Sequence, residues 1–91
     1  MPDKVHCAHI LVKTESEGKK ILDRLGKGEK FANIAKEVSL CPSSKRGGDL
    51  GTFGRGQMVK EFETAAFSLQ KGQISAIVKT KYGYHIIKRL E

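Results

Sequence analysis

The chain has 91 residues, of which 38% are apolar and 7% aromatic, and it carries 17 Lys and Arg against 10 Asp and Glu, a net charge of +7. This length fits one small domain over residues 1–91 and excludes a second domain or a long repeat array. No apolar run approaches the ~18 residues of a membrane span, and no apolar segment of a signal peptide follows Met1. We therefore expect a cytoplasmic protein, and we expect a monomer because no feature of the sequence indicates an obligate dimer.

The excess of basic residues favours encounters with polyanions without specifying a partner. Lys and Arg are spread over the whole chain, whereas specific binding of nucleic acid favours a basic block or stripe. We therefore expect weak, nonspecific binding to polyanions. A noncatalytic basic module that binds nucleic acid or peptides stays as the alternative function.

The first predicted element is a strand over residues 5–12. This run is short, contains β-branched residues and is apolar on both alternating faces apart from its histidines. A helix follows, because Thr14 and Glu17 have the spacing of a capping box. Apolar residues recur at helical intervals up to Leu25, and Gly26 ends this helix.

Two further helices are predicted at residues 31–39 and 58–69, where apolar residues again recur at helical spacing. The stretch between them, residues 40–56, is rich in turn-forming residues. It contains one short extended piece at residues 49–53, and it has room for a helical turn. We interpret this stretch as a loop, a short strand and another turn.

The carboxyl-terminal part holds two β-rich runs, residues 74–80 and 84–90, joined by a turn at residues 81–83. This pattern predicts a hairpin that closes the sheet. The order of elements is therefore strand, two helices, loop, strand, helix and two strands. Helices laid on a small sheet in this order indicate an α+β domain.

Two histidines interrupt apolar runs in the first and last predicted strands. The period of two along a strand places His9 on the same face as Cys7 and Leu11, and places His6 on the opposite face. A lone buried histidine is most often a structural residue that is satisfied by a hydrogen bond. If the two strands are neighbours, however, His9 and His85 can share a proton and fix each other's tautomer.

Apolar residues that could form a binding cup lie in the middle of the chain. Met58 and Phe62 are four residues apart in the predicted third helix, so we expect them to contact each other and to face the same way. Leu50 lies on the short strand beside glycines, and Cys41 stands in the long loop. An apolar cup bordered by a thiol and two imidazoles is a typical composition for a binding site. Ordinary core packing is the alternative for Met58 and Phe62.

Short blocks of sequence follow one another over nearly the whole chain. The blocks are HILVK at 9–13, FANIAKEVS at 31–39, CPS at 41–43, GGDLG at 47–51, GQMV at 56–59, Phe62-Glu63 with Ala66-Phe67, and YGYHII at 82–87. In this order they resemble the parvulin family of peptidyl-prolyl cis/trans isomerases, and in particular a stand-alone prokaryotic parvulin. The resemblance implies a four-stranded antiparallel sheet surrounded by helices, in the order β-α-α-α-β-α-β-β.

The resemblance also implies a site and a substrate class. It assigns catalytic positions to His9, Cys41, His85 and Thr80, and substrate-binding positions to Leu50, Phe53, Met58, Phe62 and Tyr82. The implied substrates are proline-containing peptides and unfolded proteins, and the reaction requires no cofactor and no metal.

One departure from part of the family concerns phosphate recognition. Parvulins directed to phosphorylated substrates carry a longer basic loop after the first strand, whereas Lys13 here runs directly into the sequence Thr14-Glu15-Ser16-Glu17. The carboxylates of this sequence would repel a substrate phosphate. We therefore expect no specificity for phosphoserine-proline.

Two other chemistries use the same polar residues. A Cys and His pair also occurs in acyl-transfer enzymes, but no oxyanion hole or orienting Asn or Asp is apparent beside Cys41. A zinc set of Cys7, His9, Cys41 and His85 lacks a tight Cys-x-x-Cys clamp. We also expect both cysteines to be thiols, because we expect no secretion signal.

Overall fold

The computed structural model of the chain describes residues 4–91, in which four strands form one antiparallel sheet in the order β2-β1-β4-β3. Strands β1 and β4 are therefore neighbours in the centre of the sheet. The predicted α+β fold, a four-stranded antiparallel sheet surrounded by helices, is confirmed. The elements are β1 (Lys4–Val12), α1 (Glu15–Gly26), α2 (Phe31–Val38), the α2–β2 segment (residues 39–48) with its short 3₁₀ helix η1 (Pro42–Arg46), β2 (Asp49–Gly54), α3 (Lys60–Ser68), β3 (Val78–Thr80) and β4 (Gly83–Arg89).

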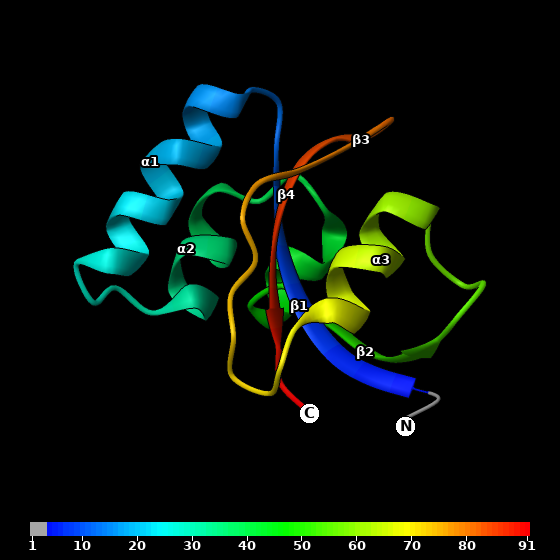
Figure 1. Cartoon of the computed structure of the whole chain (residues 1–91). Coiled ribbons are helices and arrows are strands. Elements are labelled where there is room, and N and C mark those ends of the chain that lie inside the picture. Colours follow the sequence, from blue (N-terminus) through cyan, green and yellow to red (C-terminus); the bar gives the residue numbers. More distant parts are fainter. Residues whose placement is uncertain (1–3) are drawn as a thin grey trace.

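Helices cover both faces of the sheet, with α1 and α2 on one side and α3 on the other (Figure 1). Side chains alternate along β1, so that Ala8, Ile10 and Val12 belong to the apolar cluster under α1 and α2. Val5 and Cys7 belong to the cluster under α3. Because both faces are buried, a shift of one residue in strand pairing would exchange the two sets, so the register is strongly specified.

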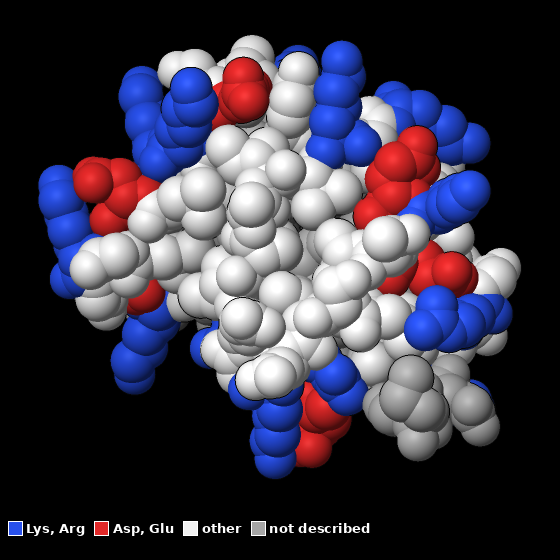
Figure 2. All heavy atoms as spheres, in the orientation of Figure 1, with Lys and Arg blue, Asp and Glu red and all other residues white. Residues whose placement is uncertain are grey.

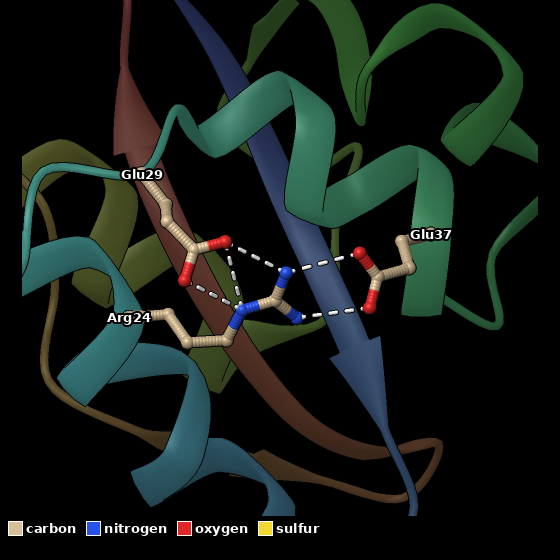
Figure 3. A network of polar contacts seen from close by, with 3 residues as sticks. All are labelled: Arg24, Glu29 and Glu37. Atoms are coloured by element: carbon tan, nitrogen blue, oxygen red, sulfur yellow. Dashed lines mark hydrogen bonds and ion pairs between the residues drawn. The ribbon is translucent and has the colours of Figure 1, made fainter.

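The first helix begins as its capping sequence predicts and is fixed to the second helix by one arginine. Thr14 is the N-cap of α1, and its side-chain oxygen accepts a hydrogen bond from the Glu17 N–H at 3.2 Å. The Arg24 guanidinium lies between the carboxylates of Glu29 and Glu37, with N···O distances of 2.8 to 3.1 Å (Figure 3). Exposed ion pairs add little stability, but this network orients α1 against α2.

The α2–β2 segment covers one edge of β1, because β2 pairs only with the first part of that strand. Further along, the His9 N–H donates to the Gly48 carbonyl at 2.9 Å. The Leu11 N–H donates to the Ser39 hydroxyl oxygen at 3.0 Å, and the Leu40 N–H donates to the Leu11 carbonyl at 2.9 Å. The segment thereby pairs the His9 N–H and both backbone groups of Leu11 along this edge of β1, and holds its own residues beside His9.

The third helix starts later than its sequence pattern predicts. It begins at Lys60, because Val59 is extended (φ −59°, ψ 148°) and stands at the N-cap position. The prediction that Met58 and Phe62 share one helix is therefore wrong, since Met58 precedes the helix. Both side chains nevertheless pack with the same apolar cluster.

Strand β3 is shorter than the predicted strand over residues 74–80. Only Val78–Thr80 forms a ladder with β4, and Ile74 makes an isolated bridge to Lys88. The interruption arises at Ser75, whose hydroxyl oxygen accepts from the Ile87 N–H at 3.0 Å in place of a backbone carbonyl. The predicted hairpin turn before β4 is confirmed, with Thr80 opposite Gly83.

Within residues 4–91, no helix has both the length and the apolar character needed to cross a bilayer. Residues 1–3 lie outside the described part of the chain. Two predictions include them: the single domain over residues 1–91, and the absence of a signal peptide after Met1.

Candidate active site

An apolar cavity of about 420 Å³ opens beside the two central strands. Its walls come from β1, the α2–β2 segment, β2, α3 with the residues before it, the β3–β4 turn and β4. Every lining residue is apolar, aromatic or an uncharged polar residue, with two histidines among them. The lining residues are His9, Leu11, Leu40, Cys41, Pro42, Leu50, Gln57, Met58, Val59, Phe62, Tyr82 and His85.

The two predicted histidines form a pair at one wall of this cavity. Their Nδ1 atoms lie 3.0 Å apart, and the planes of the rings of His9 and His85 differ by only 20°. Both residues are buried, with 5% and 4% of their surface exposed. The side of β1 that carries Cys7 and Leu11 therefore also carries His9, as the strand period predicts. His6 lies on the opposite face, where its Nε2 contacts the Asp49 carboxylate at 2.6 Å.

Burial keeps the histidine pair uncharged at neutral pH. Loss of hydration, reinforced by the neighbouring His85, lowers the pKa of His9 from 6.5 to about 4. Burial also lowers the pKa of His85 below its ordinary value. Each imidazole then carries one proton, so a hydrogen bond between two Nδ1 atoms requires that one ring donates and the other accepts.

Thr80 extends the histidine pair at the end of β3. Its hydroxyl lies 2.6 Å from Nε2 of His85, and the same oxygen accepts from the Tyr82 N–H at 3.1 Å. Thr80 itself is buried and lies outside the cavity lining, so it acts on the site through His85. Tyr82 is 62% exposed at the cavity mouth, where the Lys81 ammonium lies 5.2 Å from the centre of its ring.

Phe62 forms the apolar base of the site. Its ring meets both imidazoles edge-on, at centroid distances of 5.4 Å to His9 and 5.3 Å to His85. Leu50 and Met58 line the same cavity from β2 and from the residues before α3. Phe53, in contrast, lies outside the lining: it is buried behind Phe62, with the two ring centres 6.0 Å apart. Phe53 therefore supports the cavity wall from the core.

Both cysteines are free thiols, and they occupy different environments. Cys41 lines the cavity just before η1 and is partly exposed. Cys7 is fully buried, and the loss of hydration raises the pKa of its thiol to about 11. Within residues 4–91, no three His, Cys, Asp or Glu side chains are grouped as a metal site. The zinc set considered from the sequence is therefore not assembled.

The cavity also has walls that the sequence patterns did not single out. Leu11 lies two residues from His9, so the alternation of side chains along a strand already places it on the same face as His9. Leu40 and Pro42 flank Cys41, and Leu40 is 53% exposed. Gln57 and Val59 flank Met58 in the same way. No sequence pattern predicts these contacts, because irregular backbone has no fixed period.

This arrangement suits an apolar ligand. None of the described side chains lining the cavity is Lys, Arg, Asp or Glu. An apolar ring can fit against Phe62, Met58 and Leu50, while the thiol and the imidazoles supply the polar border. The site holds a neutral hydrogen-bonded pair beside an apolar cavity, an arrangement that favours binding and orientation over acid–base chemistry.

Comparisons with known proteins agree with this geometry. Residues 9–91 match the family described as Rotamase, PPIC-type PPIASE domain. The foldase protein PrsA of Geobacillus sp. (strain WCH70) is 57% identical over 86 residues, which cover 93% of this chain and 31% of that protein. The chain therefore spans about a third of that relative's length.

Two solved structures match the chain along almost their full lengths. The parvuline of Nitrosopumilus maritimus is 49% identical with a TM-score of 0.89, and the match covers 100% of this chain and 99% of that one. Pin from the psychrophilic archeon Cenarcheaum symbiosum is 55% identical with a TM-score of 0.87, covering 100% and 95%. The family match covers the cavity and both histidines, and on these grounds the chain belongs to the PPIC-type PPIase family, the parvulins.

Proposed function

We propose that this protein is a peptidyl-prolyl cis/trans isomerase that rotates X-Pro bonds in extended or unfolded polypeptides without forming a covalent intermediate. The observation that carries the proposal is the apolar cavity of about 420 Å³ with the neutral His9–His85 pair in its wall. Membership of the PPIC-type family supports the reaction type. The name of the Geobacillus relative, a foldase, supports polypeptide chains as substrates.

Rotation about an X-Pro bond needs only modest help. The energy barrier to rotation about a peptide bond is ~18–20 kcal/mol, because its C–N bond has partial double-bond character. An acceleration of four decades requires about 5.5 kcal/mol of transition-state stabilisation. Contacts that favour a twisted geometry over both planar forms can supply this amount without any bond being broken.

The cavity offers two such effects. Leu50, Met58 and Phe62 would hold the proline ring and exclude water, so that the substrate carbonyl sits in drier surroundings. Twisting removes amide resonance, which makes the carbonyl less charge-separated and the proline nitrogen a better hydrogen-bond acceptor. An apolar wall and a nearby polar border both favour that state.

The proposed substrates are not phosphorylated. No basic residue belongs to the described cavity lining, and a phosphate group requires cationic or N–H partners. The chain leaves β1 directly into α1, whose first turn carries Glu15 and Glu17. These carboxylates would oppose a phosphate on the residue before proline.

The alternative of a noncatalytic basic module receives no support from the site. On the face seen in Figure 2, Lys and Arg alternate with Asp and Glu around an uncharged centre. We propose that polyanion binding, where it occurs, is weak and depends on the net charge of +7 rather than on this cavity. Cytoplasmic location and a monomeric state stay predictions of the sequence.

Exchange spectroscopy with a panel of X-Pro peptides tests the proposed function. The two isomers of each peptide give separate signals, and a catalyst at low concentration adds exchange between them. We expect exchange to increase in proportion to the protein concentration. Binding of the peptides without accelerated exchange would favour the noncatalytic module, and a steep dependence of nucleic-acid binding on salt would support it further.

A further inference from the structure

The β2–α3 loop (residues 55–59) forms part of the cavity wall, although it has no regular backbone structure (Figure 1). Gln57, Met58 and Val59 in this loop line the cavity. Within the described part of the chain, no backbone group of residues 55–58 forms a hydrogen bond with another backbone group. The position of Met58 in the cavity wall therefore depends on contacts made by side chains.

Two side-chain oxygens accept hydrogen bonds from the backbone in and beside this loop. Just before the loop, the Gly54 N–H donates to Oε1 of Gln57 at 2.7 Å. Inside the loop, the Gly56 N–H donates to Oε1 of Glu63, on α3, at 2.5 Å. The bond to Glu63 is charge-assisted, and such bonds are stronger than neutral ones. The Glu63 side chain is only 19% exposed, so water competes weakly for its oxygens.

The other carboxylate oxygen of Glu63 faces Arg55, the first residue of the loop. Nη1 of Arg55 lies 3.8 Å from Oε2 of Glu63, and the Arg55 guanidinium stands over the Phe67 ring, 4.2 Å from its centre. Glu63 and Phe67 are four residues apart on α3, so they lie on the same face of the helix. Phe67 packs in turn against the apolar cluster under α3. One face of α3 therefore holds residues 55 and 56.

We infer that Glu63 is a positioning residue: by holding the Gly56 N–H, it fixes the loop that presents Met58 to the proline ring of a client. Gly56 has a left-handed backbone (φ +86°) two residues before Met58, so a change in its orientation redirects the chain that leads to Met58. Glu63 lies outside the cavity lining, so it acts on the client only through the loop. The effect on turnover rests on the proposed isomerase function, whereas the effect on the loop does not.

The loop can be tested in the free protein by ¹⁵N relaxation of the backbone amides. We expect residues 55–58 of the wild type to have the order parameters of rigid backbone, about 0.85, and those of Glu63→Ala to fall below about 0.6. Glu63→Gln has a side chain of the same length that still offers an acceptor oxygen, so its loop should stay rigid. Glu63→Asp keeps the charge but is one methylene shorter, so its loop should loosen as in Glu63→Ala.

The control is Glu61→Ala, in the same first turn of α3. Glu61 is exposed, and it takes part in none of the ion pairs among residues 4–91, so its removal should leave the loop and the turnover unchanged. A rigid loop in a folded Glu63→Ala protein would overturn the inference. Should Glu63→Ala fail to fold, a loop that is equally mobile, or equally rigid, in Glu63→Gln and Glu63→Asp would overturn it.

A double-mutant cycle on turnover tests whether the effect passes through Met58. In the peptide exchange assay we expect Glu63→Ala and Glu63→Asp to lower kcat/KM about fivefold to tenfold, because the wall of the cavity is misplaced. Glu63→Gln should keep at least about half of the wild-type value. In a Met58→Ala background, Glu63→Ala should change kcat/KM less than about twofold, since the side chain that it positions is gone. Equal fractional losses in both backgrounds would overturn the positioning of Met58.

The two readouts separate this inference from the proposed function. An inactive wild type whose loop loosens in Glu63→Ala would refute the proposed function and keep the contact between Glu63 and the loop. An active Glu63→Ala protein with a loosened loop and wild-type kcat/KM would overturn the positioning role and keep the proposed function.

Discussion

His9 and His85 lie diagonally across two neighbouring strands: His9 pairs with Ile87, and His85 pairs with Leu11. Long or aromatic side chains at diagonal positions of neighbouring strands can contact each other. Here the Nδ1 atoms of the two imidazoles form a hydrogen bond of 3.0 Å. A shift of one residue between β1 and β4 would separate the two rings. The apolar residues that fix this register therefore also assemble the site.

Truncation of the cavity wall should reduce isomerisation more than stability. Met58 is only partly buried, so Met58→Ala removes a contact with the proline ring while leaving the core largely intact. We expect kcat/KM to fall about tenfold to a hundredfold in a peptide assay. Phe62→Ala should also lose activity, with about 3–5 kcal/mol of stability, because Phe62 is 2% exposed. Ile74→Ala, outside the cavity, is the control, and full activity in both folded cavity variants would show that the cavity is assigned wrongly.

Cys41 should be dispensable for the reaction itself. Because rotation about the X-Pro bond breaks no covalent bond, Cys41→Ser should retain measurable activity, reduced by the altered polarity at the cavity border. The peptide exchange assay measures this directly. Complete loss of activity in a folded Cys41→Ser protein would instead support a nucleophilic role for the thiol.

The histidine pair should make the fold sensitive to mild acid. The pKa of His9 is about 4 in the folded protein and 6.5 in its unperturbed state, so the unfolded chain binds more protons between these values. Stability should therefore be highest above pH 6.5 and fall as the pH drops toward 4, by up to about 3 kcal/mol in total.

Denaturant unfolding of the wild type and of His9→Leu at a series of pH values checks this dependence. The slope between pH 6.5 and 5 should be shallower in His9→Leu, since the carboxylates with lowered pKa, Glu29 and Asp49, titrate below this interval. Parallel curves for the two proteins would contradict the assignment. Unchanged peptide exchange in His9→Leu, with lower stability, would make the histidine pair purely structural.

Gly48 should be a position where one added methyl group disturbs the site. Its backbone is left-handed (φ +86°), and a Cβ there would collide with the carbonyl oxygen of His9. Gly56 has the same φ, but a Cβ at that position would meet no atom within 4 Å, so Gly56→Ala carries the backbone strain alone. We expect the midpoint of thermal unfolding and kcat of Gly48→Ala to be well below the corresponding values of Gly56→Ala. Equal losses in the two variants would show that the contact with His9 has no effect.

Phosphorylation before proline should not improve a substrate. We expect kcat/KM for a phosphoserine-proline peptide to be equal to or lower than that for the matching serine-proline peptide, because no Lys or Arg belongs to the described cavity lining. Peptide exchange at constant ionic strength measures the ratio. A tenfold preference for the phosphorylated peptide would contradict the proposed substrate class.

Regular elements and the site residues on them could be predicted from the sequence, whereas irregular segments could not. The strand period placed His9 with Leu11 and away from His6, and the capping residue Thr14 placed the start of α1. The strand predicted over residues 74–80 was too long, because at Ser75 a side-chain hydroxyl replaces a backbone carbonyl as the acceptor of the Ile87 N–H.

The limits of the cavity were harder to predict for the same reason. Leu40 and Pro42 reach the cavity through an irregular segment, and the extended backbone of Val59 delays α3. Phe53 has the residue type expected at the site, but its ring is in the core behind Phe62. Whether an aromatic side chain such as Phe53 faces the cavity or the core depends on tertiary packing, and no local sequence pattern carries that information.

The covered edge of β1 has a consequence for the proposed isomerase, whose proposed clients are unfolded chains. An open strand edge can recruit an extended client as an additional strand, which would trap the client and promote aggregation. Here the His9 N–H and both backbone groups of Leu11 already have partners in the α2–β2 segment. A client polypeptide therefore cannot pair with the sheet as an additional strand beside the histidines, so it is free to leave after each turnover.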